Sequence, residues 1–505
     1  MTQARGLIRS MMVIGSAQAA NIFLSILRMK VLAVLLGPTG VGLLSVYNNL
    51  NTMVSDVAGL GMKSSGVRQI ASARGEETEL SRTRRVLVVA HLAQGLLAML
   101  GVWLLREKIS TWLFGDSTYA TQIALIGIAI LLTLMANAHI ALLQGLRRIG
   151  DLGRVTVLSA LSATIIGLLA VWLLGEGGLI WLVLVQPIAA LVTALIYVRC
   201  LPKPTMRHLG MAEIWHIWKP MARLGLAFML GGLATAGTLL LVRGLITQEM
   251  GLEAAGHFAA SWGITMTYVG FLLGAMGADF YPRLTEVIKN PTKTAKLVND
   301  QTQLGLAIGG PVLLLLIGLA PWVINLLYSS DFAPAAELLQ WQTVGNIFKI
   351  ASWPMGFCLA AAARGNIFLL VQINFNFLFL GMLFPTLSHY GIIAAGPAFM
   401  IAYILHFALL NILVYRAHSF RWEILSLVLL GLHVILASGL LLLALLAPPF
   451  AAGIASPFLA LITGVFGLRV VLTKIGLEGR VATKLGRVYA IVGWPIAEPN
   501  ERYDD

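Results

Sequence analysis

Apolar runs about as long as a membrane is thick recur along the whole chain. A bilayer core about 30 Å thick requires about twenty apolar residues per α-helix. The connections between the runs are short, and none could fold as a separate globular domain. We therefore predict about fourteen transmembrane helices. The expected spans are 8–30, 41–62, 85–106, 119–143, 153–174, 178–199, 221–247, 254–278, 300–327, 336–361, 366–387, 391–415, 424–447 and 450–472.

The scarcity of charge supports this prediction. Of the 505 residues, 58% are hydrophobic and 11% are charged, whereas a soluble globular chain is about 25% charged. The mean hydropathy is +0.86. This small number of charges cannot cover the surface of a large soluble domain. The expected fold class is therefore an all-α polytopic membrane protein.

The basic residues predict the orientation of the helices. Lys and Arg cluster after the second, fourth, sixth and eighth spans and are scarce in the alternate connections. Cytoplasmic loops carry such an excess, so we expect a bacterial inner-membrane protein with both termini in the cytoplasm. The net charge of +13 then reflects topology, and no nucleic-acid partner is expected. We expect the first apolar run to be a membrane helix rather than a signal peptide, because it continues past Asn21.

An internal repeat predicts how the helices are grouped. The segment Gly37-Pro-Thr-Gly-Val-Gly42 matches Gly251-Leu-Glu-Ala-Ala-Gly256 at an offset of 214 residues, and an arginine precedes each copy. Six helices per copy preserve orientation, which makes the repeat parallel. The expected architecture is two parallel six-helix lobes plus two C-terminal helices.

The expected parts of the chain are an N-terminal lobe at 1–200, a C-terminal lobe at 201–415, helices 13 and 14 within 416–475, and a cytoplasmic tail at 476–505. For the tail, the sequence leaves open an interfacial helix around 479–492 and an ordinary solvated segment.

Signatures of soluble enzymes are missing. The sequence has no P-loop, GxSxG, HExxH or dinucleotide-binding glycine set. The two cysteines, Cys200 and Cys358, lack the spacing of a metal or redox site. We expect a transporter with no catalytic residue, no metal and no cofactor other than a coupling proton or ion.

Polar residues inside the predicted spans are the candidates for a transport site, because charged groups there are costly and usually face a cavity or a partner. On four helices these residues recur at helical spacing and share one face. The four stripes are Gln18, Asn21, Ser25 and Arg28; Asn49, Thr52 and Asp56; His257, Ser261, Thr265 and Tyr268; and Gln342, Asn346, Lys349 and Trp353.

We interpret the stripes as the lining of a hydrated cationic cavity between the lobes. Arg28, Arg243 and Lys349 would bind an anionic substrate, and the arginine side chain is suited to phosphate. Asp56 and His257 are the candidates for coupling to a proton or ion. The expected lining residues are Asn21, Asn49, Ser261, Tyr268, Asn346 and Trp353.

Each candidate also has a structural interpretation. The arginines would extend toward the outer headgroups, Asp56 would pair with a basic neighbour, and the amides would join helices by hydrogen bonds. The residue pattern alone leaves both interpretations open.

Several segments resemble a known family. They include Leu36-Gly-Pro-Thr-Gly-Val-Gly42, Gly59-Leu-Gly-Met62, Val67-Arg-Gln-Ile-Ala71, Leu142-Leu-Gln-Gly-Leu-Arg-Arg148 and Phe280-Tyr-Pro-Arg-Leu284. Over about residues 8–415 the chain is similar to polysaccharide flippases of the Wzx type, in the multidrug/oligosaccharidyl-lipid/polysaccharide exporter superfamily.

The resemblance implies a flippase that moves an undecaprenyl-pyrophosphate-linked oligosaccharide from the cytoplasmic to the periplasmic leaflet. The cargo would be an O-antigen, enterobacterial common antigen or related surface glycan, as in lipopolysaccharide biosynthesis. Arg28, Arg243 and Lys349 match the cavity cations of such proteins. Glycan polymerase and chain-length proteins are the implied partners. In related lipid II flippases the last two helices help to hold the lipid tail.

Three other functions remain as alternatives. The drug-exporting branch of the superfamily usually has twelve helices and acidic residues in the membrane, and here Asp56 is the one acid in the interior of a predicted span. A lipid II flippase would differ only in cargo. A glycan polymerase or ligase would need a large periplasmic loop, and the loops predicted on that side are short.

Overall fold

The structure is almost entirely helical. The computed structural model describes residues 2–73, 75–201, 210–362, 365–477, 480–491 and 493–496. Within these ranges no residue lies in a β-strand. The prediction of an all-α polytopic membrane protein is confirmed.

Two very long helices carry the two glycine segments of the internal repeat. Helix α1 (Thr2–Ala58) is kinked at Gly37, where φ is 62° and ψ is −164°. Helix α7 (Met211–Val287) is kinked at Gly251, where φ is 84° and ψ is 175°. A positive φ strains residues that have a Cβ atom, so glycine is suited to both positions. Each kink divides one helix into two membrane-length halves.

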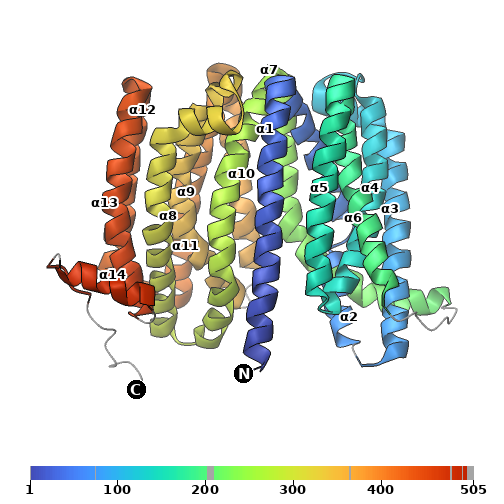
Figure 1. Cartoon of the computed structure of the whole chain (residues 1–505), viewed down its shortest axis with the longest axis horizontal. Coiled ribbons are helices and arrows are strands. Elements are labelled where there is room, and N and C mark those ends of the chain that lie inside the picture. Colours follow the sequence, from blue (N-terminus) through green and yellow to red (C-terminus); the bar gives the residue numbers. More distant parts are fainter. Residues whose placement is uncertain are drawn as a thin grey trace. The chain divides into compact units, whose positions relative to one another are not determined.

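The other helices are shorter, and most of them are labelled in Figure 1. They are α2 (Met62–Ser72), α3 (Glu77–Phe114), α4 (Ala120–Gly145), α5 (Ile149–Leu174), α6 (Leu179–Arg199), α8 (Pro291–Leu327), α9 (Pro334–Ala361), α10 (Gly365–Tyr390), α11 (Ala395–His418), α12 (Ile424–Leu446), α13 (Pro449–Ile475) and α14 (Arg480–Ile491).

The described residues contain fourteen membrane-length segments: two each in α1 and α7, and one in each of α3 to α6 and α8 to α13. By length and apolar composition, eight helical stretches of the described chain qualify as membrane spans, and three of them join two segments each. The halves of α7 and helix α9 lie outside these eight. These helices carry two of the predicted polar stripes.

Several helices extend beyond their predicted spans. The third span was expected at 85–106, whereas α3 begins at Glu77 and ends at Phe114. The ninth was expected at 300–327, whereas α8 begins at Pro291. Hydropathy detects only the part of a helix that needs lipid, and a helix can continue as a polar extension outside the bilayer core.

The chain divides into two compact units. Unit 1 comprises Met1–Ala259 and Leu327–Asp331, and unit 2 comprises Ala260–Leu326 and Phe332–Asp505. Helix α7 therefore contributes to both units. The division into lobes at residues 200 and 415 stays a prediction.

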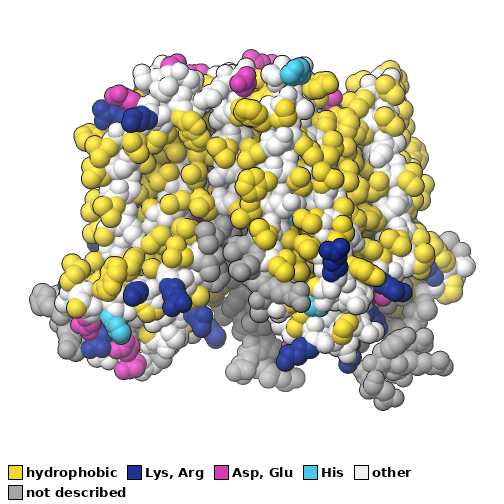
Figure 2. Space-filling view, turned by 180° about the vertical axis from the view of Figure 1, so that it is seen from behind, with side chains coloured by type: hydrophobic (Ala, Val, Ile, Leu, Met, Phe, Trp, Pro, Cys, Tyr) yellow, Lys and Arg dark blue, Asp and Glu magenta, His cyan; other side chains and the backbone are white. Residues whose placement is uncertain are grey.

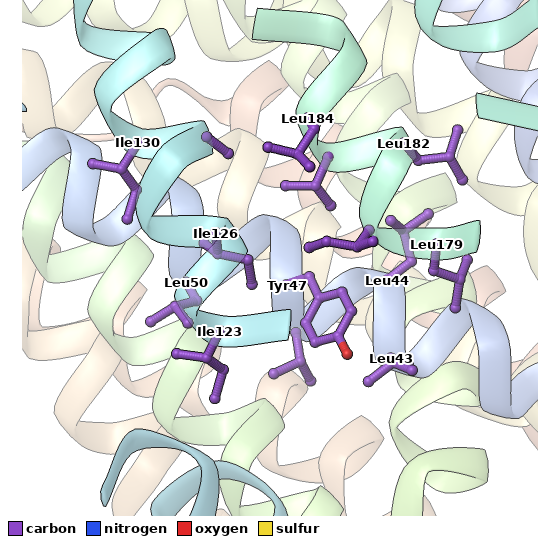
Figure 3. Packing of buried hydrophobic residues seen from close by; sticks show 14 of the residues in the cluster. Leu43, Leu44, Tyr47, Leu50, Ile123, Ile126, Ile130, Leu179, Leu182 and Leu184 are labelled. Carbon is purple, nitrogen blue, oxygen red and sulfur yellow. The ribbon is translucent and has the colours of Figure 1, made fainter. Parts of the chain in front are cut away.

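The core of unit 1 forms where the second half of α1 packs against α4 and α6 (Figure 3). Leu43 and Tyr47 come from α1, Ile126 from α4 and Leu182 from α6, and each is at most 4% exposed. The Tyr47 ring lies edge-on to Phe114, with a centroid distance of 6.2 Å. These contacts fix the position of the α1 half that begins at the Gly37 kink.

In unit 2, α12 and α13 pack closely against α8. A Cβ atom at Gly310 of α8 would overlap the His433 ring of α12, and one at Gly318 would overlap Ser456 of α13. Small residues allow such close approach of helices in lipid. The two C-terminal helices are therefore an integral part of unit 2.

A polar network also joins α8 to the start of α12. Gln303 Nε2 donates to Glu423 Oε2 at 2.8 Å, and Ser426 Oγ donates to Asn299 Oδ1 at 2.7 Å. Asn299 and Gln303 are at most 1% exposed. Burial makes an unpaired polar group costly, so these hydrogen bonds favour one position of α8 relative to α12.

The surface of the helices fits a lipid environment. Figure 2 shows hydrophobic side chains over the middle of the helices and charged side chains near their ends. Many large apolar residues are well exposed, among them Trp172 at 70% and Phe377 at 72%. A water-soluble protein rarely exposes apolar surface on this scale.

Candidate functional site

The two glycine segments of the repeat touch each other inside unit 1. A Cβ atom at Gly42 would overlap the carbonyl oxygen of Leu252, and a Cβ at Gly256 would overlap the carbonyl oxygen of Pro38. An offset of 214 residues relates Pro38 to Leu252 and also Gly42 to Gly256. The contact is thus reciprocal, as expected for two repeat copies that meet around a local twofold relation.

Arg243 lies on α7 beside this contact and is fixed by the backbone of α1. Its side chain is 8% exposed, and its Nη1 donates to the carbonyl oxygen of Ser45 at 2.9 Å. Its Nε is buried and has no hydrogen-bond partner. The arginine therefore joins the two kinked helices of unit 1.

His257 and Lys30 also bond to backbone in unit 1. The His257 Nε2 lies 3.1 Å from the carbonyl oxygen of Asp331, an acceptor that requires the ring nitrogen to donate. Lys30 Nζ donates to the carbonyl oxygen of Tyr328. These bonds secure the short segment 327–331, and they give His257 a structural partner in addition to its predicted coupling role.

Arg28 has a much weaker partner. It is half-buried on α1, and its Nη1 lies 3.4 Å from Gln186 Oε1 on α6. Asn21 and Ser25 share its helix face and are also half-buried. In the described part of the chain, Arg28 forms no ion pair. An intramembrane guanidinium with one long hydrogen bond retains most of its capacity to bind an anion.

Asp56 lies on the second half of α1 and is exposed. Its Oδ2 faces α7, 3.9 Å from where a Cβ atom would stand on Gly232. Among the residues that the structure describes, no basic side chain forms an ion pair with it. Asn49, two turns earlier on the helix, has a buried Nδ2 with no hydrogen-bond partner. The geometry thus leaves Asp56 available for a coupling role.

Lys349 is the candidate cation of unit 2. It is half-buried on α9; its Nζ lies 3.2 Å from Met266 Sδ on α7 and 5.5 Å from the centre of the Tyr403 ring on α11. No carboxylate pairs with it within the described ranges. A thioether and an aromatic face stabilise an ammonium only modestly. Lys349 therefore retains most of its capacity to bind an anion.

The polar stripe of α9 faces α7. Thr265 Oγ1 donates to Gln342 Oε1 at 3.1 Å, and both residues are fully buried. Ser261 and Asn346 are fully buried as well. The Asn346 side chain has neither a donor nor an acceptor partner for its buried amide atoms. Buried amides of this kind usually bind water, which fits a hydrated interior in unit 2.

Trp353 and Tyr268 contribute to packing. Trp353 lies 3.1 Å from a Cβ position on Gly277. Its ring is tilted against Phe280 and edge-on to Phe357, with centroids 5.9 Å and 4.6 Å away. Tyr268 is half-buried against the core of unit 2. Their predicted role as cavity-lining residues stays a prediction. The cationic cavity between the predicted lobes would combine residues of both units, and it also stays a prediction.

Comparisons with known proteins place the chain in a family. The family described as "Polysaccharide biosynthesis protein" matches residues 7–288. The chain belongs to this family. The predicted resemblance to flippases of the multidrug/oligosaccharidyl-lipid/polysaccharide exporter superfamily is thereby confirmed, and this family member is a multi-pass membrane protein.

Two curated relatives match three quarters of the chain. The Lipid III flippase of Escherichia coli (strain K12) is 24% identical over 396 residues, which cover 75% of this chain and 91% of the relative. The Lipid III flippase of Shigella flexneri matches equally well.

Solved structures share the fold. A Lipid II flippase MurJ in an inward closed conformation has a TM-score of 0.65 at 12% identity, covering 93% of this chain and 99% of its own. An inward-facing multidrug resistance MATE family transporter of the MOP superfamily has a TM-score of 0.65 at 16% identity. The match covers 79% of this chain and 96% of the transporter. These likenesses establish a transporter fold.

An aromatic cluster of this family member was missed by the sequence analysis. The Phe375 ring of α10 stacks on Tyr403 of α11 at 4.1 Å, and Trp262 of α7 meets Phe399 edge-on at 5.6 Å. His406 lies 6.1 Å from Tyr403. Spacing along one helix cannot reveal a cluster assembled from three helices. Tyr403 belongs to the cluster and also lies 5.5 Å from Lys349 Nζ, so it connects the two.

A groove between α12 and α13 was also missed. Its volume is about 620 Å³, and nine of its ten lining residues are apolar. The exception, Thr463, donates its hydroxyl to the Leu459 carbonyl at 2.8 Å. The lining residues are Val428, Leu432, Leu436, Leu459, Leu461, Ile462, Thr463, Val465, Phe466 and Trp494. Uniformly apolar helices carry no periodic signal that would distinguish a groove from a lipid-facing surface.

Proposed function

We propose that the protein flips an undecaprenyl-pyrophosphate-linked oligosaccharide from the cytoplasmic to the periplasmic leaflet of the bacterial inner membrane. The observation that carries the proposal is the pair of intramembrane cations, Arg28 and Lys349, neither of which has a carboxylate partner among the described residues. Membrane proteins keep such costly charges where a substrate or pathway needs them. A pyrophosphate is an anion that matches them.

The cations have different chemical roles in this proposal. The planar guanidinium of Arg28 offers two parallel N–H groups to phosphate oxygens. Lys349 acts as a compact point charge beside the Tyr403 ring. Arg243 is held by the Ser45 carbonyl and contributes positive potential rather than a direct contact. The glycan would be any O-antigen, enterobacterial common antigen or related surface unit that carries this headgroup.

The apolar part of the substrate requires a separate site. The groove between α12 and α13 is lined by side chains that suit a polyprenyl chain. It opens to lipid, because Leu461 and Ile462 are 65% and 64% exposed. A chain bound there would remain in the hydrocarbon layer while the headgroup crosses.

Transport would proceed by alternating access, driven by a proton or ion gradient or by the membrane potential. The potential is worth about 2.3 kcal/mol per charge per 100 mV. Asp56 is the preferred coupling group, because it is exposed and forms no ion pair in the described chain. His257 is the weaker candidate because it donates to the Asp331 carbonyl. Both termini would lie in the cytoplasm, and glycan polymerase and chain-length proteins would use the product.

Deletion of the gene in its own cell tests the proposal. We expect lipid-linked precursor to accumulate on the cytoplasmic side and surface glycan to be lost, and wild-type protein to restore both. The double variant Arg28→Gln, Lys349→Gln should fail to restore them at equal expression. The matched control is Lys108→Gln, an exposed lysine of α3. Normal glycan and normal precursor in the deletion strain would rule out this function.

A second candidate is a lipid II flippase, favoured by the likeness to the solved Lipid II flippase over 93% of this chain. The same deletion separates the two, because cell-wall precursor rather than surface-glycan precursor would then accumulate. A drug antiporter of the superfamily would instead lower drug resistance on deletion and leave both precursors unchanged.

A further inference from the structure

The C-terminal segment turns back onto the last membrane helix. Gly476 ends α13 with φ of 88°, and α14 follows from Arg480 to Ile491. A second glycine turn at Gly493, with φ of 78°, directs Trp494 back toward α13. Figure 1 shows α14 lying across the end of α13. Of the two interpretations that the sequence left open, the structure favours the helix.

Three contacts hold this segment in place. The Tyr489 hydroxyl donates to the Val465 carbonyl at 2.6 Å, and Tyr489 is 7% exposed. The Trp494 ring stacks on Phe466 with a centroid distance of 6.1 Å and an interplanar angle of 21°. The segment is therefore bound to the face of α13 that forms one wall of the groove.

Arg469 makes the third contact. Its guanidinium lies 4.6 Å from the Trp494 ring centre, and its Nη2 donates to the Pro495 carbonyl at 3.1 Å. Arg469 holds Trp494 in place and is not among the residues that line the groove. A substitution of Arg469 can thus release the segment without altering the wall of α13 that a ligand would touch.

Trp494 forms one end of the groove. From α12 the lining residues are Val428, Leu432 and Leu436, spaced at every fourth position along one face. Over these eight residues α12 rises about 12 Å. Trp494 contacts Phe466 at the α14 end of this length. It lines the groove and is 39% exposed, so part of the residue is accessible to a ligand.

An enclosed end matters for an apolar ligand in a membrane. Lipid tails are as apolar as the groove, so the hydrophobic effect does not drive a polyprenyl chain from lipid into it. Selective retention must come from close packing against a fixed shape. An indole ring held at one end supplies a large rigid surface for such packing.

We propose that Tyr489 and residues 493–495 form a latch that closes the α14 end of the groove and retains the polyprenyl chain of the substrate there. Trp494 is the residue that touches the chain, and Tyr489 and Arg469 are positioning residues. This inference rests on the proposed flippase function. It adds a determinant of lipid-chain selectivity that lies outside the membrane helices.

The test uses the full-length protein in nanodiscs of phosphatidylethanolamine and phosphatidylglycerol. The probe is undecaprenyl pyrophosphate with a photoreactive diazirine in its chain, and the readout is the yield of cross-linking to α12 and α13. Phospholipid is present throughout, so unselective occupation of the groove competes with the probe. Thermal unfolding of each variant verifies that it is folded.

We expect Trp494→Ala and Arg469→Gln to lower the yield by about three- to tenfold, the loss expected for one aromatic contact. Trp494→Phe should restore most of it. Tyr489→Phe should lower it less, because it removes one hydrogen bond. The matched control is Trp172→Ala, which removes an exposed tryptophan of α5 in unit 1 and should leave the yield unchanged.

Two negative outcomes have different meanings. If the wild type captures the probe and all the latch variants capture it equally, α14 is only an interfacial anchor and the latch is wrong while the flippase function stands. If the wild type captures no probe and the deletion strain accumulates no precursor, the function itself is wrong and the latch fails with it. If Trp494→Ala does not fold, the cross-linking yields of Arg469→Gln and Trp494→Phe test the latch instead.

Discussion

Arg28 and Arg243 are the same residue type in related places, yet unit 1 holds them differently. Arg28 stands nine positions before Gly37, and Arg243 stands eight positions before Gly251. Arg243 is almost fully buried and bonds to the Ser45 carbonyl at 2.9 Å. Arg28 is half-buried and lies 3.4 Å from the Gln186 amide oxygen.

The difference distinguishes a cation held by backbone from a cation whose donors are mostly unused, and the second kind is the one that we propose binds substrate. A short hydrogen bond to backbone that cannot move fixes Arg243 between α1 and α7. A long hydrogen bond to a flexible amide leaves most of the Arg28 donors for a ligand. Their positions in the sequence suggest the same role for both arginines. Their different hydrogen-bond partners suggest a separate role for each.

The largest effect is expected from Arg28→Ala. A charge-assisted hydrogen bond contributes about 1.5–3 kcal/mol, so affinity for undecaprenyl pyrophosphate should fall by about ten- to hundredfold. Binding to protein in nanodiscs measures this. Thermal stability should change little, because the Gln186 contact is long.

The control for that experiment is Arg106→Ala, at a half-exposed arginine of α3 whose Glu107 pair is 4.0 Å long. It should bind as the wild type does. If Arg243→Ala weakened binding more than Arg28→Ala did, the assignment of the two arginines would be reversed.

Replacing each arginine by lysine sharpens the comparison. Lysine at position 243 keeps the charge but is too short and lacks the fork that reaches the Ser45 carbonyl. Arg243→Lys should therefore destabilise the protein by about 1–3 kcal/mol, whereas Arg28→Lys should leave stability unchanged. Thermal unfolding of both variants measures the contrast, and equal melting temperatures would contradict it.

The glycine contact between the repeat copies sets the positions of both arginine-bearing helices. In Gly256→Ala the new Cβ would overlap the Pro38 carbonyl, and overpacking of this kind costs about 1–3 kcal/mol. Gly237→Ala, in the same helix with open space around it, is the matched control. It should be neutral or stabilising by up to about 1 kcal/mol. Unfolding free energies that fell equally in both would show that packing at Gly256 is not special.

The fold was predictable because a bilayer requires apolar runs of defined length. Charge scarcity and the apolar runs were enough to predict an all-α membrane protein with fourteen segments, whereas their grouping into two lobes stays a prediction. Helix ends were less predictable: α3 starts at Glu77, eight residues before its predicted span, because a polar extension carries no hydropathy signal.

The role of the candidate site residues stays a prediction, and only their surroundings can be compared with the sequence. Polar spacing singled out Arg28, Asp56 and Lys349 as candidates, because a charge inside a span is conspicuous. It could not distinguish Arg28 from Arg243, since their partners, Gln186 and the Ser45 carbonyl, are distant in sequence or belong to the backbone. The groove residues and Trp494 were missed for the same reason, because Trp494 reaches α13 only through two glycine turns.

The smallest effect is expected from removing the Arg28 partner. A hydrogen bond of 3.4 Å contributes little, so Gln186→Leu should weaken binding of undecaprenyl pyrophosphate by about twofold at most. Gln186→Glu has a similar shape but adds a carboxylate beside Arg28, which would neutralise the guanidinium and weaken binding by about tenfold. The pair separates the charge of Arg28 from its orientation. If Gln186→Leu weakened binding as much as Gln186→Glu, the amide itself would be the ligand contact, and Arg28 would be a structural cation like Arg243.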